Sequence, residues 1–134
     1  MRTNLTVASL LLCLLTGCTF QRVVEVPGAS GRIIDALTGL PVARVSVTRQ
    51  GVVKKTVVSE TVVTDTDGRF LVKPVDRVRF YPTFPRVFVG PYYVTGNVEF
   101  VAAGYETRVV TNRAPYLDFR PVDLATIELR HVRD

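Results

Sequence analysis

The sequence predicts an all-β protein that forms a single β-sandwich of about seven strands. The first observation is alternation with period two: Val45 and Val47 alternate with polar neighbours, and so do Ile127 and Leu129. Such alternation is typical of strands that bury one face. The second observation is that turn-forming residues separate these runs, at a spacing suited to a sandwich. The third is that no segment after residue 17 has an apolar stripe of helical period over ten residues.

The first 17 residues have the order of a secretory signal peptide. Arg2 precedes an apolar run over residues 5–15, and small residues follow that run. The run is shorter than the roughly 20 apolar residues that a membrane-spanning helix needs, and polar residues follow closely, which makes a retained transmembrane helix the weaker alternative. We therefore expect residues 1–17 to be a signal peptide that is removed.

Leu15-Thr16-Gly17-Cys18 matches the lipobox of bacterial lipoproteins at all four positions, with an aliphatic and two small residues before a cysteine. This resemblance implies cleavage between Gly17 and Cys18, a diacylglyceryl thioether on Cys18 and, usually, acylation of the new N-terminus. Each buried methylene contributes about 0.8 kcal/mol, and one chain alone binds reversibly, so several chains make anchoring durable. In Gram-negative lipoproteins an aspartate after the cysteine commonly signals inner-membrane retention. Thr19 stands there, which favours the outer membrane if the source has one. The alternative is a chance cysteine near an ordinary cleavage site.

We expect residues 18–30 to be a lipidated tether, with room for a brief edge strand over residues 23–26, and residues 31–134 to be the β-sandwich domain. A chain of 134 residues allows one such domain. The expected strands cover residues 31–35, 44–48, 52–64, 69–72, 98–102, 106–111 and 126–130, which are rich in valine, threonine and aromatic residues. The run 52–64 is long enough for two short strands or one bent strand. The only other cysteine, Cys13, lies in the leader, so the mature domain has no internal disulfide.

The charge of the chain argues against a nucleic-acid partner. The formal net charge is +5, and the basic residues are spread along the chain in groups no larger than the pair Lys54-Lys55. A nucleic-acid or polybasic membrane motif concentrates its basic residues. Attraction to anionic lipid headgroups or to acidic polysaccharide stays open as an alternative to a merely solvated surface.

Three segments in this order resemble the carboxypeptidase regulatory-like domain. They are residues 31–47, which contain the turn Thr38-Gly39-Leu40-Pro41, residues 64–70, which contain Asp65-Thr66-Asp67-Gly68, and residues 103–107, which begin Ala103-Gly104. The resemblance covers residues 28–130. It implies a prealbumin-like sandwich that is a non-catalytic module, of the kind appended to peptidases, outer-membrane transporters and envelope proteins. The chain departs from the family between residues 74 and 94, where a proline-rich aromatic segment replaces a short link.

The residues that carry chemistry are few, and we expect neither an enzyme nor a bound metal or cofactor. Asp65 and Asp67 could form half of a calcium loop, but a third aspartate and a final glutamate are missing, so we expect a turn whose carboxylates accept local backbone amides. His131 is the only histidine and is expected at the surface. The sequence has no Gly-x-Ser-x-Gly turn and no reactive mature thiol for a catalytic triad, and too few ligands for zinc.

Residues 80–93 are the most unusual segment, because they hold six aromatic residues and three prolines. We expect the rings to fold back over one open end of the sandwich as an apolar lid. The alternative is a surface for carbohydrate or peptide, because prolines pre-order the backbone and exposed tyrosines suit such partners. The candidate ligand-binding residues are Tyr81, Phe84, Phe88, Tyr92 and Tyr93. Exposed rings around a concavity would favour carbohydrate, and buried rings would favour a scaffold.

Together these features indicate a membrane-anchored lipoprotein of the cell envelope with a non-catalytic structural or protein-interaction sandwich. The alternative is a carbohydrate-binding envelope module that uses residues 80–93. The expected partners are the lipid bilayer, through acylated Cys18, an envelope protein and, in the alternative, a carbohydrate.

Overall fold

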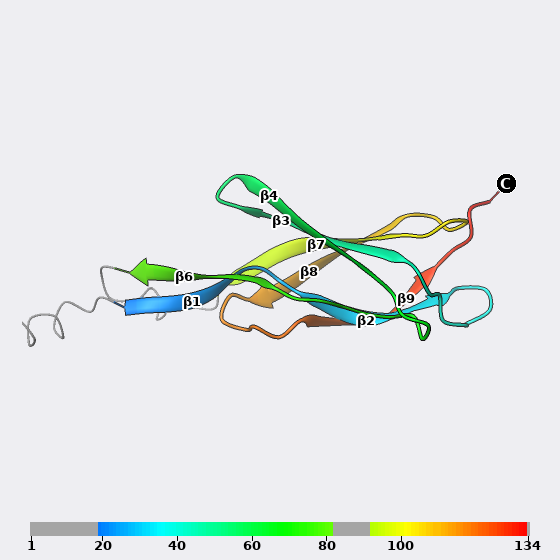
Figure 1. The fold of residues 1–134 in the computed structure, drawn as a ribbon, viewed down its shortest axis with the longest axis horizontal. Helices are drawn as coiled ribbons and strands as arrows, with labels where there is room; N and C mark the ends of the chain where they lie inside the picture. The colour runs from blue at the N-terminus through cyan, green and yellow to red at the C-terminus, as the bar shows by residue number, and fades with distance from the viewer. Residues whose placement is uncertain (1–18, 82–91, 134) are drawn as a thin grey trace, which may run out of the picture.

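The computed structural model describes residues 19–81 and 92–133, and it confirms the all-β sandwich (Figure 1). Within these residues no helix is long and apolar enough to cross a membrane. The described strands are β1 (Thr19–Val26), β2 (Ala29–Asp35), β3 (Ser46–Val53), β4 (Thr56–Val63), β5 (Arg69–Val72), β6 (Val75–Tyr81), β7 (Tyr93–Val101), β8 (Arg108–Pro115) and β9 (Val122–Leu129). They exceed the expected seven mainly because β1 and β6 form an additional pair.

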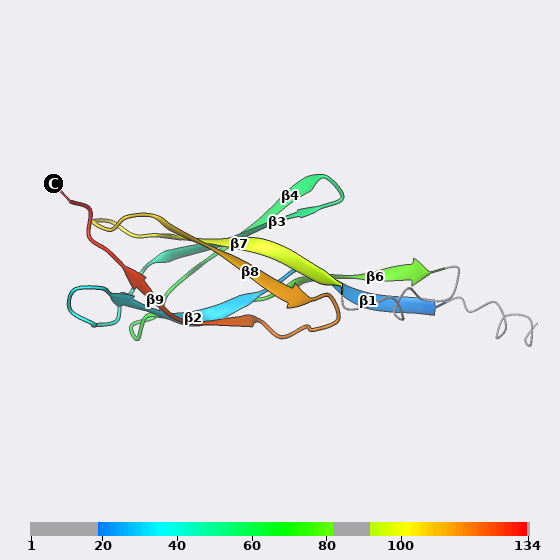
Figure 2. The ribbon, with the colours of Figure 1, turned by 180° about the vertical axis from the view of Figure 1, so that it is seen from behind.

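Two sheets make up the sandwich. One has four antiparallel strands in the order β4-β3-β7-β8, and the other has three in the order β5-β2-β9, with β2 and β9 parallel. Figure 2 shows the same two layers from behind, with β7 and β8 in one and β2 and β9 in the other. Each sheet therefore has one face available for a shared core.

The core lies between these two sheets. Its buried members are Ala29, Ile33, Val45, Val47, Phe70, Val72, Val98, Phe100, Ile127 and Leu129. The rings of Phe70 on β5 and Phe100 on β7 meet edge to face, with centroids 5.5 Å apart, and so join the two layers. Full burial of such a side chain stabilises the fold by about 1.5–3 kcal/mol. The burial predicted from alternation at Val47 and Ile127 is confirmed.

The β1–β6 ribbon, meaning the antiparallel pair of β1 and β6, extends from one end of the sandwich (Figure 1). It continues the β2–β5 pair beyond Pro27 and Pro74, whose nitrogens carry no hydrogen to donate to a ladder. The register shifts between Val24 and Val26, which leaves Glu25 as an extra residue in β1. Such a bulge redirects a side chain.

The predicted turn at residues 65–68 is confirmed. Gly68 has a φ of 71°, a left-handed conformation that favours glycine. The Oδ1 atom of Asp65 accepts hydrogen bonds from the amides of Asp67 (2.9 Å) and Arg69 (2.8 Å). Asp65 therefore satisfies the turn backbone, as expected for a local structural role.

Several boundaries differ from the sequence predictions. Residues 19–26 of the expected tether form β1, β8 ends at Pro115, and β9 begins at Val122. The run 52–64 contains a two-residue hairpin turn at Lys54 and Lys55, both with positive φ (48° and 67°), which separates β3 from β4. Strand β6 was not expected, because charged residues interrupt its apolar pattern and its partner β1 lies far away in the sequence. Strand β7 begins at Tyr93 rather than near residue 98, because it pairs with β8 from Tyr93 to Phe100.

Candidate functional site

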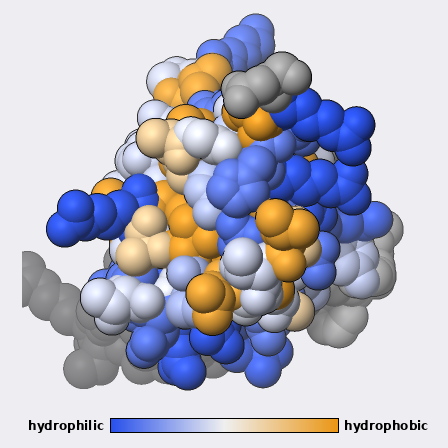
Figure 3. Space-filling model, turned by 90° about the vertical axis from the view of Figure 1, so that its right-hand side faces the viewer, coloured by the Kyte–Doolittle hydropathy of each residue, from blue (hydrophilic) through white to orange (hydrophobic). Residues whose placement is uncertain are grey.

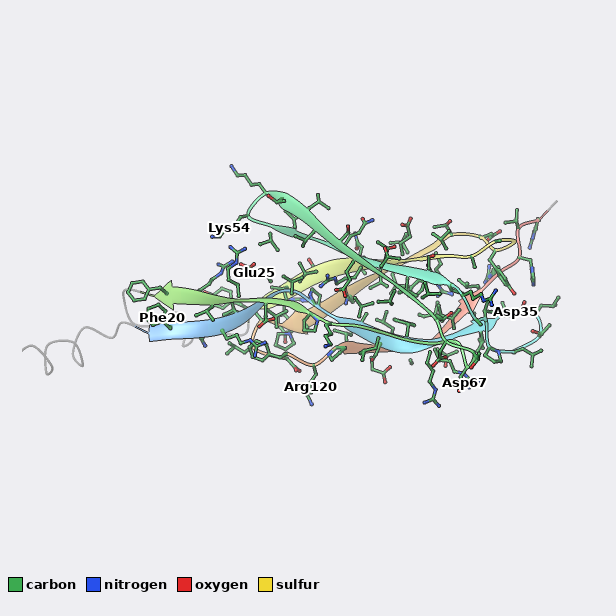
Figure 4. The ribbon with its side chains drawn as sticks, in the orientation of Figure 1. Phe20, Glu25, Asp35, Lys54, Asp67 and Arg120 are labelled. Atoms are coloured by element: carbon green, nitrogen blue, oxygen red, sulfur yellow. The ribbon has the colours of Figure 1, made fainter. Side chains whose placement is uncertain are left out.

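The candidate site is a groove of about 410 Å³ where the β1–β6 ribbon leaves the sandwich. Its walls come from β1, β6, the β3–β4 turn and the residues at the start of β7. The lining residues are Val23, Val24, Glu25, Val52, Val53, Lys54, Arg79, Tyr92, Tyr93, Val94 and Tyr116. Figure 4 labels two of these lining residues, Glu25 on the ribbon and Lys54 at the β3–β4 turn. The groove thus combines an apolar floor with aromatic and charged groups.

Three tyrosines from two chain segments meet in the groove. The rings of Tyr92 and Tyr116 pack edge to face with centroids 5.8 Å apart, and the Tyr116 amide donates a hydrogen bond to the Tyr92 carbonyl. The guanidinium carbon of Arg113 lies 4.1 Å from the centroid of the Tyr93 ring, which is cation–π geometry. These contacts hold the tyrosines in place without enclosing them.

The expected lid is wrong for the two tyrosines of that segment that the structure describes. Tyr92 is 43% exposed and Tyr93 is 46% exposed, and neither belongs to the core. For Tyr93 the reason is the strand parity of β7, because Val98 and Phe100 point into the core and Tyr93 has the opposite parity. Tyr92 precedes the strand, and its ring packs against Tyr116 instead of the core. The exposure of Tyr92 and Tyr93 beside a groove fits the ligand-surface alternative.

A buried carboxylate, that of Glu25, contacts two arginines beside the groove. The Glu25 side chain is only 4% exposed, and its Oε1 accepts a 2.7 Å hydrogen bond from Nη2 of Arg79. The Nε atom of Arg77 lies 3.4 Å from Glu25 Oε2. Both arginines are about half exposed. The bulge therefore places Glu25 beneath two guanidinium groups, and Lys54 adds a further cation at the wall.

The other predicted site residues have separate outcomes. Cys18, Phe84 and Phe88 lie outside the described residues, and of Tyr81 the structure describes only the strand backbone. Tyr92 and Tyr93 lie together in the groove. Glu25, Arg79 and Tyr116 could not be predicted as site residues, since only contacts between distant parts of the chain bring them to the groove. A lone Tyr116 in a segment with ordinary turn composition does not stand out.

A second polar cluster lies at the opposite end of the sandwich, around Asp35. Its Oδ2 accepts a 2.8 Å hydrogen bond from the Tyr105 hydroxyl and lies 2.6 Å from Nε2 of His131, whose ring stacks on Tyr105 at 4.4 Å. Hydrogen bonds, above all from the Thr38 amide and the Tyr105 hydroxyl, hold the pKa of Asp35 well below its usual range. The hydrogen bond between the Tyr105 hydroxyl and Asp35 also raises the pKa of Tyr105.

This distal end has a mostly polar surface. Figure 3 faces it and shows hydrophilic side chains around smaller apolar areas. His131 is exposed, as predicted, and the sequence did not reveal its bond to Asp35. An open depression of about 530 Å³ lies beside His131, lined mostly by charged and loop side chains. Among the described residues, no group of three or more histidine, cysteine, aspartate or glutamate side chains could hold a metal ion.

Comparisons with known proteins add no family assignment. No protein-family model matches the chain, and no curated protein matches it. Its function is therefore inferred from its own residues and their arrangement.

Proposed function

We propose that this chain is a lipid-anchored protein of the bacterial cell envelope whose β-sandwich is a non-catalytic interaction module. The complete lipobox at residues 15–18 supports the anchor. Strand β1 includes Thr19, the residue next to the cysteine that would carry the lipid. Thr19 in place of aspartate favours the outer membrane in a Gram-negative source.

The resemblance to carboxypeptidase regulatory-like domains supports a module without catalysis. Gly39 and Gly68 occupy the turn positions of that resemblance with φ of 70° and 71°. The only histidine of the chain, His131, bonds to Asp35 rather than to a serine or a thiol. The two glycines thus form turns, and His131 contacts a carboxylate that accepts hydrogen bonds from a turn.

The groove beside the ribbon is the observation that carries the interaction role. Tyr92 and Tyr93 keep nearly half of their surface exposed while their neighbours hold them in position. Tyrosine offers a large contact area, loses only two side-chain rotations on binding, and is enriched among the residues that dominate protein interfaces. A protein of the envelope is therefore the first candidate partner.

Carbohydrate is the second candidate ligand, and a specific observation favours it. The exposed tyrosine rings surround a concavity instead of covering the core, which was the arrangement expected of a sugar site. Arg79 and Lys54 at the wall add positive charge, so acidic polysaccharide fits this groove better than a neutral one.

The test replaces Tyr92 and Tyr93 together with alanine in the full-length chain, purified from bacterial membranes. Because neither ring belongs to the core, we expect the unfolding temperature to fall far less than after truncation of a core ring, whereas partner capture by crosslinking in cells, or retention by an immobilised polyuronate, should be lost. Leu37→Ala is the matched control, since it removes an 83% exposed side chain at the other end. A double variant that keeps every crosslinked partner and its polysaccharide retention would exclude the groove as the binding site.

A polyuronate and a neutral glucan, compared on the same double variant, separate the two candidate ligands. Tyrosine-dependent retention by the polyuronate alone indicates an acidic glycan. Tyrosine-dependent crosslinks to one envelope protein, without retention by either polysaccharide, indicate a protein partner.

A further inference from the structure

The far end of the β1–β6 ribbon is unusually apolar for an exposed surface. Phe20 is 74% exposed and Phe80 is 51% exposed, and their rings contact each other with centroids 5.0 Å apart (Figure 4 labels Phe20). The strand register places Phe20 opposite Phe80 and Arg22 opposite Val78, so all four side chains lie on one face of the ribbon. Val78 is also mostly exposed. Two aromatic rings therefore stand at the tip, away from the core of the sandwich.

The position of this tip in the chain indicates what covers it. Strand β1 begins at Thr19, and a strand rises about 3.3 Å per residue, so the backbone of Phe20 lies within about 7 Å of Cys18. Each polar interfacial layer of a bilayer is roughly 5–8 Å thick. If Cys18 carries acyl chains, as proposed above, Phe20 cannot be far from the lipid headgroups.

One arginine lies next to the tip. Arg22 follows Phe20 on the same face, its side chain is mostly exposed, and its guanidinium lies 5.1 Å from the Phe119 ring. Arg22 also pairs with Asp76 on β6. Along the ribbon, aromatic rings thus come first and an arginine second. Aromatic side chains concentrate at the membrane interface, and arginine is attracted to anionic headgroups.

We propose that the Phe20–Phe80 tip inserts into the headgroup region of the membrane that holds Cys18, so that the ribbon is a second membrane contact beside the lipid. This inference rests on the proposed lipid anchor. The consequence is a restricted orientation of the domain relative to the membrane, because both the acyl chains and the two-stranded tip hold it there. The groove beside the ribbon then lies at a fixed distance from the membrane surface.

The experiment uses tryptophan as a depth probe, because the chain contains none. Phe20→Trp and Phe80→Trp are made separately in the full-length chain, and Leu37→Trp is the exposed control at the opposite end. Each protein is purified from membranes and reconstituted into vesicles of phosphatidylethanolamine and phosphatidylglycerol, with or without bromine on the acyl chains. Bromine quenches tryptophan only on close approach.

We expect the fluorescence of Phe20→Trp and Phe80→Trp to shift to the blue in vesicles and to be lost when the lipids are brominated, while Leu37→Trp keeps both its emission maximum and its intensity. Having both tip variants keeps the test valid if one of them folds poorly. Vesicle flotation and the mass of the N-terminal peptide are measured on the same samples.

Two results would overturn the inference in distinguishable ways. If the acylated protein floats with the vesicles but neither tip probe is quenched, the anchor stands and the insertion is refuted. If Cys18 carries no lipid and the protein stays in solution, both the anchor and the insertion are refuted. A blue shift without quenching that grows with protein concentration would assign the tip to a second copy of the chain, and so would also refute insertion.

Discussion

Replacing Gly68 with alanine should destabilise the domain more than the same change at any exposed turn glycine. Gly68 has a φ of 71°, where an alanine costs about 1–2 kcal/mol. A Cβ there would also lie 2.3 Å from the backbone oxygen of Ile33, too close for any real contact. The backbone must then move, which disturbs the 2.8 Å hydrogen bond from the Ile33 amide to the Gly68 carbonyl, worth about 0.5–1.5 kcal/mol. The expected loss is therefore about 2–3 kcal/mol or more.

Gly39 and Gly104 provide matched controls for this prediction. Their φ values are 70° and 81°, and a Cβ at either position would meet nothing within 4 Å. Gly39→Ala and Gly104→Ala should thus lose only the conformational part, about 1–2 kcal/mol. Urea unfolding followed by circular dichroism measures all three. If Gly68→Ala is no less stable than Gly39→Ala, the close packing of this turn against β2 does not matter, and the reasoning is refuted.

Two further predictions concern Asp35 and the β3–β4 turn. Because hydrogen bonds lower the pKa of Asp35 in the folded state, its stabilising contribution is complete above the unfolded carboxyl pKa of about 3.9 and is lost as the pH falls below that value. The difference in unfolding free energy between the wild type and Asp35→Asn should therefore shrink as the pH is lowered, and a difference that stays constant would contradict this. Replacing Lys54 and Lys55 with Asn-Gly should stabilise the domain by about 1 kcal/mol, because both positions have positive φ and Asn-Gly suits a two-residue hairpin. Thermal unfolding checks this, and a lower melting temperature would contradict it.

The parts of the fold that could be predicted are those encoded locally. Val47 and Ile127 alternate with polar neighbours, and Gly68 follows an aspartate that can accept turn amides, so short windows of sequence indicated these strands and this turn. Strand β6 could not be found in this way. Its charged residues become an advantage only opposite β1, where Arg79 meets Glu25. The pair Lys54-Lys55 carries no turn signal, so the sequence left open whether the run 52–64 holds one bent strand or two, and it did not indicate where the turn lies.

The candidate site was predictable to the same limited extent. The cluster of aromatic residues drew attention to Tyr92 and Tyr93, but the sequence could not show whether they point inward or outward. That depends on the register of β7 against β8, which sets Tyr93 opposite Pro115 and leaves its ring outside the core. Tyr116 and Glu25 join the site only through tertiary contacts between distant strands.

The central claim, that this sandwich is held to a membrane by lipid on Cys18, is tested most directly by the mass of the mature N-terminal peptide. The chain is expressed at full length in bacteria, recovered from the membrane fraction and digested, and the N-terminal peptide is analysed by mass spectrometry. We predict a peptide that begins at Cys18 and carries a diacylglyceryl group, with or without an additional acyl chain on its amino group. A peptide with an unmodified Cys18, or one that begins at any other residue, would contradict the claim.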